Sequence, residues 1–238
     1  MKNITQNPYN FRFKFVLFPV LLLGIAFLTG CNQMQKAKTE EVIQYEKNYE
    51  IIGLEKEEML GEVNPAIVAT VDRSTANLQP VHGSIYYHKG EKIHVPSGRY
   101  QITGTPAGNI IIYDENDELI LRELVGYVAG VYSLTLDIDE THGIYIDGGY
   151  TDYTIMPVET EKSVDLSAGL WKVGLDIEPG TYTITTEVDF GYLHIIEENK
   201  EPIVYEVISG EHVGGTVQLK EGQTIRITKT SMVHFEKK

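Results

Sequence analysis

The sequence predicts an all-β protein, and two observations carry this prediction: an apolar–polar alternation along most of the chain after residue 83, and an internal repeat. A period of two is typical of strands that bury one face. Val, Ile, Tyr and Thr dominate the alternating segments, and Gly, Pro, Asp or Asn separate them. We expect strands over residues 84–88, 99–103, 109–113, 132–138, 143–147, 170–174, 181–187, 191–196, 202–208, 215–219 and 223–228.

The repeat consists of three sequence blocks that occur twice in the same order. The matched blocks are 90–103 with 174–185, 108–118 with 191–201, and 134–146 with 217–227. This order predicts two tandem β-modules over 83–158 and 164–238, with 159–163 as the linker. A module of about six short strands buries its apolar faces by folding into two packed sheets, so we expect small β-sandwiches or jelly rolls.

The first thirty residues have the pattern of a secretory signal. They carry three basic residues and no acidic one, and an apolar run over 15–28 ends in small residues. The sequence Leu28-Thr29-Gly30-Cys31 resembles the lipobox of bacterial lipoproteins. The resemblance implies that the Cys31 thiol receives a diacylglycerol and that cleavage of the signal peptide leaves Cys31 as the first residue.

The alternative for this run is an uncleaved transmembrane helix. The run is short for a membrane span, which needs about 20 residues. Pro19 and Gly24 also weaken its helix. Two acyl chains on Cys31 would anchor the protein stably to the membrane. We therefore expect a lipid-anchored protein on the extracytoplasmic face of the cell membrane.

Charge and cysteine content exclude several classes of function. The chain has 34 acidic and 20 basic residues, a net charge of -14, and removal of three basic residues with the signal gives -14 - 3 = -17. This acidity excludes nucleic acid as a partner, because nucleic-acid binding needs a basic surface. The single cysteine excludes an internal disulfide and a CxxC-type zinc site.

Between the signal and the repeat we expect a short stalk over 31–82. Residues 32–40 are polar and predict a flexible spacer, whereas apolar positions at helical spacing over 41–63 predict an amphipathic helix. Asn64-Pro65 should end this helix. Residues 66–72 predict an isolated strand, and 73–82 a loop.

A second resemblance lies in the later repeat. The pattern Trp171-x-Val-Gly-x-Asp176-Ile-x-Pro-Gly-Thr-Tyr182 resembles an uncharacterised β-module of secreted and lipid-anchored proteins of Gram-positive bacteria. The earlier repeat departs from this pattern, because Lys92 stands where Asp176 does. The resemblance implies a fold and a location but no chemistry.

No strong catalytic signature occurs in the sequence, so we expect no enzyme, although paired carboxylates for hydrolysis stay open. His82, His88 and His94 are close enough in sequence for a metal site, but solvated histidines are the simpler interpretation. The carboxylates of one acidic loop form the candidate calcium site, which does not fit an EF-hand: Asp137, Asp139, Asp147 and Asp152. No other cofactor is expected.

Aromatic residues supply the remaining candidates for ligand binding. Exposed rings on β-modules stack on sugars or form protein interfaces. The candidates are Tyr86, Tyr87, Tyr145, Tyr150, Tyr153, Tyr192 and Trp171. We expect a non-catalytic module that binds a protein or a cell-envelope ligand near the membrane. The alternatives are a calcium-dependent site or hydrolase centred on residues 137–152, and a structural spacer of the envelope.

Overall fold

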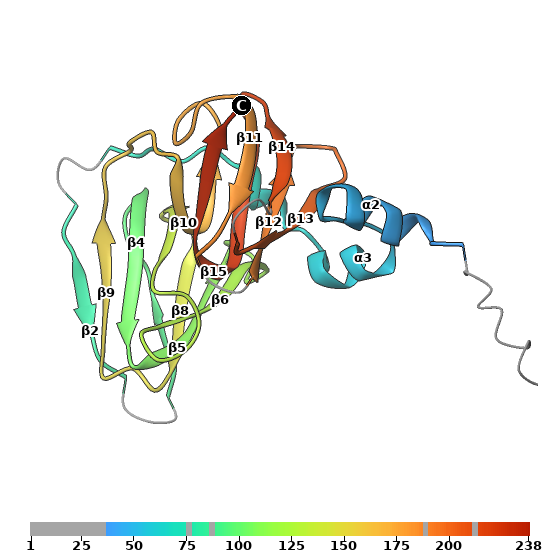
Figure 1. Cartoon of the computed structure of the whole chain (residues 1–238). Coiled ribbons are helices and arrows are strands. Elements are labelled where there is room, and N and C mark those ends of the chain that lie inside the picture. Colours follow the sequence, from blue (N-terminus) through green and yellow to red (C-terminus); the bar gives the residue numbers. More distant parts are fainter. Residues whose placement is uncertain (1–36, 75–77, 86–88, 188–189, 211–213) are drawn as a thin grey trace, which may run out of the picture. The chain divides into compact units, whose positions relative to one another are not determined.

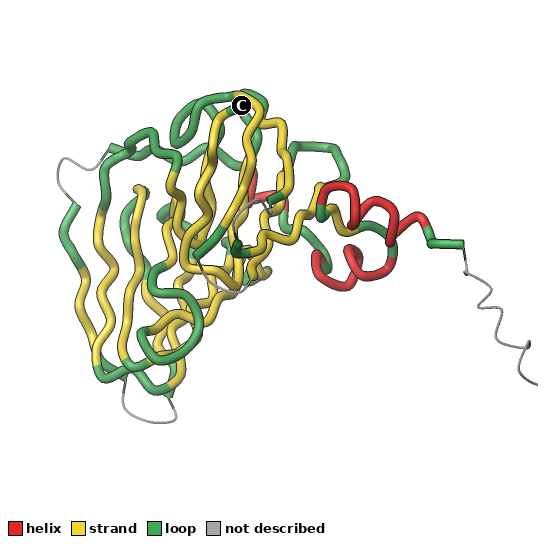
Figure 2. The backbone as a smooth tube through the Cα atoms, in the orientation of Figure 1, coloured by secondary structure: helices red, strands yellow, loops and turns green. Residues whose placement is uncertain are grey.

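Strands dominate the structure (Figures 1 and 2), a computed structural model that describes residues 37–238 except 75–77, 86–88, 188–189 and 211–213. Residues 39–238 form one compact unit. The helical elements are α2 (Glu40–Asn48), α3 (Leu54–Leu60) and the 3₁₀ helix η2 (Pro65–Val68). The strands are β1 (Glu50–Ile51), β2 (Val81–Gly83), β3 (Glu91–Ile93), β4 (Gly98–Thr105), β5 (Ala107–Tyr113), β6 (Leu119–Gly126), β7 (Leu134–Ile138), β8 (Gly143–Gly148), β9 (Asp152–Pro157), β10 (Asp165–Lys172), β11 (Gly180–Thr185), β12 (Phe190–Ile196), β13 (Ile203–Ile208), β14 (Gly215–Leu219) and β15 (Thr224–Lys237).

The all-β class is confirmed, but the predicted helix over 41–63 is divided. Tyr49 adopts a left-handed conformation that ends α2, and Gly53 has φ +71° just before α3. Between them β1 pairs with β13, so α2 and α3 lie beside that edge of the sheet (Figure 1). The strand expected over 66–72 is wrong: Asn64 caps the 3₁₀ helix η2 there, with Pro65 at its first position.

The strands of residues 81–157, the first half, pair in two separate groups. One group has the order β2-β9-β4-β7, and the other has the order β3-β8-β5-β6. Every pairing in these groups is antiparallel. Four of these strands, β2, β3, β6 and β9, were not predicted. β2 and β3 have three residues each, and Arg122 and Glu123 interrupt the apolar pattern of β6.

The strands of residues 165–237, the second half, repeat this pairing order, but β10 and β15 each take part in both groups. In one group, the start of β10 pairs with the end of β15. The same end of β15 also pairs with β11, and β11 pairs with β14. In the other group, the end of β10 pairs with the start of β15. The same start of β15 also pairs with β12, and β12 pairs with β13. β15 therefore takes the positions of both β8 and β9, so its predicted extent, 223–228, is too short.

Equivalent tyrosines mark the same position in both halves. Tyr100 and Tyr182 are each 1% exposed, and each phenol group donates to the carbonyl oxygen four residues earlier at 2.8 Å. The acceptors are Pro96 and Glu178. A buried ring with a satisfied hydroxyl fixes the turn that precedes the strand, which is why the sequence repeats here.

Two hydrophobic clusters follow the two halves but are not independent. Ala168, Leu170 and Ile196 of the second half belong to the cluster of the first half. A parallel contact of β7 with β10 joins the halves at Thr135 and Gly169. A Cβ at Gly169 would lie 1.8 Å from the Thr135 carbonyl oxygen, so only glycine permits this junction.

Candidate functional site

Two of the predicted ligand-binding tyrosines are core residues, which corrects that prediction. Tyr150 is 0% exposed, and its hydroxyl lies 2.7 Å from the carbonyl oxygens of both Gly108 and Val125. Tyr153 is 2% exposed and donates to Glu91, and burial, followed by this bond, raises the pKa of Tyr153 to about 12. Neither ring is free to stack on a ligand.

The other predicted aromatic residues are only partly accessible. Tyr145 is half-buried on β8, and Tyr192 lies between Phe190 and the Lys229 ammonium group. Trp171 donates its indole N–H to the Ser167 carbonyl oxygen at 2.7 Å. Tyr86 and Tyr87 lie outside the described residues, as do Cys31 and the lipobox residues Leu28, Thr29 and Gly30.

The four candidate calcium ligands are not gathered into one site. Asp139 accepts from the backbone and hydroxyl groups of Thr141, and Asp147 accepts from Asn109. Asp152 is exposed at the start of β9, whereas Asp137 pairs with arginines. Among the residues that the structure describes, no three His, Cys, Asp or Glu side chains form a metal-binding group.

Asp137 belongs to a buried cluster of two arginines and two aspartates. Arg73 donates to Asp137 Oδ2 at 2.6 Å and to Asp176 Oδ1 at 2.7 Å, and Arg99 donates to Asp137 Oδ1 at 2.8 Å. Asp176 and Arg99 are 0% and 1% exposed. The Trp171 ring lies 4.5 Å from the Arg99 guanidinium carbon, a cation–π geometry. The formal charges of the two arginines and the two aspartates cancel. Through these bonds Arg73 binds both Asp137 of the first half and Asp176 of the second half.

This cluster gives a physical reason for the later sequence pattern. Asp176 accepts from the Lys172 backbone N–H at 2.6 Å, and Gly174, at φ +98°, donates to the Ile177 carbonyl oxygen. The aspartate and the glycine therefore form the tight turn that follows β10. The pattern from Trp171 to Tyr182 thus encodes structure at these positions.

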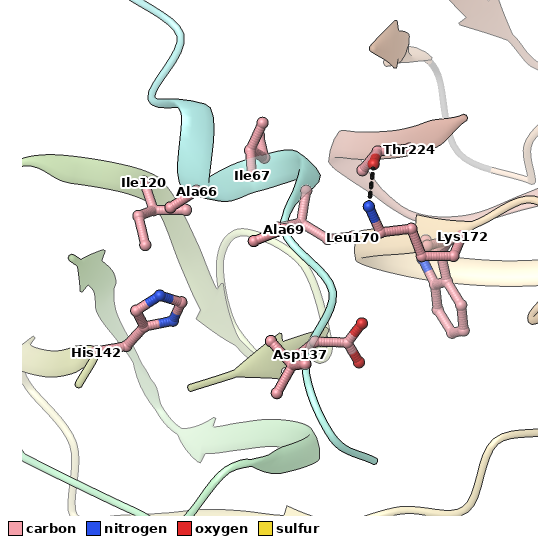
Figure 3. A pocket seen from close by; sticks show the side chains of 11 residues that line it. Ala66, Ile67, Ala69, Ile120, Asp137, His142, Leu170, Lys172 and Thr224 are labelled. Atoms are coloured by element: carbon pink, nitrogen blue, oxygen red, sulfur yellow. Dashed lines mark hydrogen bonds between the residues drawn. The ribbon is translucent and has the colours of Figure 1, made fainter. Parts of the chain in front are cut away.

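A small cavity lies beside the cluster (Figure 3). Its volume is about 20 Å³, which suits about one water molecule. Asp137, His142 and Leu170 are among the side chains that line it. The Lys172 ammonium group donates to Thr224 and to the carbonyl oxygen of Val68, the last residue of η2. Ala69 and Val71, which follow η2, also line this cavity.

A larger pocket, of about 400 Å³, is also lined by His142. It lies between η2, the β5–β6 hairpin loop over 114–118 and the turn that precedes β8. Asp114 forms its wall, and hydrogen bonds from the Asn64 side chain and from the backbone of 116 and 118 hold the pKa of Asp114 low. Three of the side chains that line this pocket are acidic: Asp114, Glu115 and Glu118.

The most exposed aromatic side chains in the described part of the chain were not predicted. Tyr127, Val128 and Tyr132 are 81%, 69% and 61% exposed in the loop between β6 and β7. The two tyrosine rings stack with centroids 6.5 Å apart and planes at 27°. We call these three residues the tyrosine platform. A sequence signal for this surface exists, because two tyrosines lie close to glycines in the run Gly126-Tyr-Val-Ala-Gly-Val-Tyr132.

The platform loop is held in place by the strands beneath it. Val131, 1% exposed, exchanges backbone hydrogen bonds with Leu124 and Gly126 at 2.8 Å, and the Tyr132 N–H donates to the Ser231 hydroxyl. Gly130 has φ +81°, and a Cβ there would lie 2.0 Å from the Leu124 carbonyl oxygen. A rigid loop that presents exposed rings loses little entropy when a partner binds.

The described histidines form no nucleophile–base–acid arrangement. His82 lies 3.0 Å from the Thr154 hydroxyl, His234 contacts Asp165, and His142 accepts from the Asp139 backbone. His194 has no hydrogen-bond partner, and His88 lies outside the described residues. No helix in the described part of the chain has the length and apolar character needed to cross a membrane. Comparison with protein-family models, curated proteins and solved structures found no match to this chain.

Proposed function

We propose that this protein is a membrane-anchored, non-catalytic binding protein of the cell envelope, and that the tyrosine platform is its contact surface. One observation carries the proposal: Tyr127, Val128 and Tyr132 are exposed together on a loop that backbone hydrogen bonds fix in one conformation. Aromatic rings are enriched where proteins meet their partners, because they offer large contact areas at a low entropy cost.

The architecture proposed for this function is two tandem jelly-roll modules. The recurrence of the same strand-pairing order over 81–157 and 165–237 supports it, as do the two hydrophobic clusters. Among the residues that the structure describes, only the first module carries a platform of this kind. The second module would then act mainly as its support, through Ser231 beneath the loop.

The proposed location is the extracytoplasmic face of the membrane, with Cys31 as the lipid-bearing residue. Its support is the lipobox-like sequence at 28–31. Incorporation of radiolabelled palmitate in cells tests this part directly. Cys31→Ser should abolish labelling and release the protein from the membrane fraction, whereas labelling that survives in Cys31→Ser would contradict the assignment.

Binding to purified, insoluble cell-wall glycan tests the platform. The full chain in detergent should co-sediment with the glycan, and the double variant Tyr127→Ala/Tyr132→Ala should lose at least about tenfold in affinity, because truncation of an aromatic residue at the centre of a binding surface costs about 2 kcal/mol or more. Leu54→Ala is the matched control, since Leu54 is 76% exposed on α3.

The control and the alternatives separate the outcomes. Equal binding by the double variant and the Leu54→Ala control would contradict the proposed surface. Absence of glycan binding, together with platform-dependent crosslinking to one membrane protein, would support the same surface with a protein as the partner. A spacer function predicts that neither assay responds to the tyrosine substitutions.

A further inference from the structure

We propose that residues 39–63 form a releasable segment, which detaches from the sheets as one unit while residues 64–238 stay folded. Its release lengthens the connection between the lipid anchor and the two halves. The inference rests on the anchor proposed above at Cys31, because the segment lies between that residue and the two halves in the chain. Its 25 residues span up to about 85 Å when fully extended.

The releasable segment buries very little surface. α2 and α3 contain no buried residue, and Ile51 of β1 is the only buried residue among 39–63. The apolar side chains of Ile43 and Leu54 are 51% and 76% exposed. Parts of a protein with few buried apolar contacts open locally at a lower free energy than global unfolding needs. Hydrophobic burial therefore contributes little to the attachment of this segment.

Backbone groups at the edge of the sheet provide part of the attachment (Figure 1). Two residues of β1 pair with Val204 and Tyr205 of β13. The Asn48 side chain exchanges hydrogen bonds of 2.6 and 2.8 Å with the Thr216 backbone of β14. When the segment leaves, these edge groups meet water, and hydrogen bonds to water replace those that are lost. The net cost of breaking each contact is therefore small.

Two further contacts join side chains near the surface. The Tyr45 hydroxyl group donates to Glu206, and Lys56 pairs with Glu201, whose side chain is 75% exposed. Ion pairs that are exposed to water contribute little to stability. These contacts and those of Asn48 and β1 follow one another along the chain. A load from the N-terminal side therefore breaks them one at a time.

The attachment changes at residue 64, where the chain enters the core. The Asn64 side chain donates to Asp114 at 2.8 Å, and Ile67, 4% exposed, belongs to the hydrophobic cluster of the first half. The Val68 carbonyl oxygen accepts from Lys172 of the second half. Detachment beyond residue 63 would expose apolar core surface to water, which is unfavourable.

Arg73 strengthens this boundary. It binds Asp137 of the first half and Asp176 of the second half. Its removal would leave the two aspartates with Arg99 as the remaining arginine of the cluster, and an uncompensated buried charge is strongly destabilising. The release thus has a fixed end point before η2.

Native-state hydrogen exchange of the full chain in detergent, with Cys31→Ser, tests the release. The Glu206 and Thr216 amides donate to Tyr49 and Asn48 of the segment, so both become free when it detaches. They should share one protection factor, at least about 100-fold below that of the amides between β12 and β15. Their exchange should also depend less on urea, because local opening exposes less surface. Protection equal to that of β12 would overturn the proposal.

An asparagine pair tests whether the segment leaves as one unit. Asn48→Ala should speed exchange of the Glu206 amide by about fivefold or more, although Glu206 donates to Tyr49, because both contacts open together. Asn116→Ala removes an exposed asparagine from the β5–β6 loop and should leave this rate unchanged. A Glu206 rate that is the same in both variants would contradict release as a unit.

Magnetic tweezers measure the length that is released. With handles on the Cys31 thiol and at the C-terminus, the full chain should show a reversible first extension of no more than about 85 Å. This step should occur at a lower force than unfolding of the strands. One combined event, or a first extension clearly longer than this, would overturn the proposed boundary. Neither experiment needs lipid or a binding partner, so their failure is distinguishable from failure of the proposed anchoring.

Discussion

The two halves of the molecule have the same strand-pairing order but use their loops and buried polar groups differently. In the first half, β8 and β9 are separate strands, and the loops carry the tyrosine platform and the acidic pocket. In the second half, β15 runs through both positions, and the turn after β10 contributes Asp176 to the buried ion cluster.

The comparison distinguishes positions that maintain the strand arrangement in both halves from positions whose chemical character has diverged. Tyr100 and Tyr182 keep the same buried hydrogen bond because the strand arrangement needs it, whereas Lys92 and Asp176 occupy matched positions with opposite charges. Lys92 forms an exposed pair with Asp117, and Asp176 is fully buried against two arginines. At this pair of positions the halves have diverged from an exposed ion pair to a buried ion cluster.

The largest expected effect sharpens the contrast between the matched positions 92 and 176. Asp176→Ala leaves Arg73 and Arg99 with an uncompensated buried charge, so it should lower the free energy of unfolding by about 3–5 kcal/mol. Lys92→Ala should cost less than about 1 kcal/mol, because its ion pair is exposed. Urea unfolding measures both, and similar values for the two variants would contradict the contrast.

A second contrast concerns His194, whose matched position in the first half is Ile111. His194 is 2% exposed, neither ring nitrogen has a partner, and burial, then Arg226, lowers the pKa of His194 to about 3. Below pH about 6.5 the unfolded chain takes up the proton first, so stability falls by up to about 1.4 kcal/mol per pH unit towards pH about 3.

Replacement of this histidine checks that effect. His194→Ile should remove the contribution of His194 to the pH dependence of the free energy of unfolding between pH 6.5 and 5. Most carboxylates have not yet titrated in this range. The measurement is the difference in urea midpoint between variant and unmodified protein at each pH. A difference that stays constant with pH would show that His194 does not couple folding to protonation.

The equivalent tyrosines test the shared framework. Tyr100→Phe and Tyr182→Phe each remove one hydroxyl that donates to a carbonyl oxygen, so each should cost about 1 kcal/mol in thermal unfolding. The two losses should be of similar size, because the two hydrogen bonds have the same length and the two rings the same burial. A large cost in only one half would break the equivalence of the halves.

The smallest expected change in stability belongs to the platform. Tyr127→Ala/Tyr132→Ala should alter the free energy of unfolding by no more than about 0.5 kcal/mol per residue, since exposed side chains away from the core contribute little. Circular dichroism during thermal unfolding measures this change. A loss of several kcal/mol would indicate that the rings are packed against the fold and are not free for a partner.

The sequence predicts the strand class and at least part of most strands, because their alternation of apolar and polar residues reflects one buried face. Of β10 and β15 it predicts only the end and the start. It does not predict β6 well, where Arg122 and Glu123 interrupt the pattern, and Glu123 is buried with a pKa raised by that burial. Local periodicity contains no information on such long-range burial.

The site residues were less predictable than the strands. Tyr150 and Tyr153 resemble surface tyrosines in sequence, and only the packing of β4, β5 and β9 shows that they are buried. Arg73 and Asp176 are 103 residues apart in sequence, so their contact depends on the tertiary fold. The tyrosine platform could in principle have been predicted from the sequence, because glycines flank or interrupt its loop.

Site-specific photocrosslinking tests the proposed binding surface most directly. A photoreactive phenylalanine derivative at position 127 of the full chain, in intact cells, should form a discrete crosslink to an envelope component. The same derivative at position 54, an equally exposed site on α3, should not form that crosslink. Discrete crosslinks from position 54 and none from position 127 would contradict the platform as the contact surface.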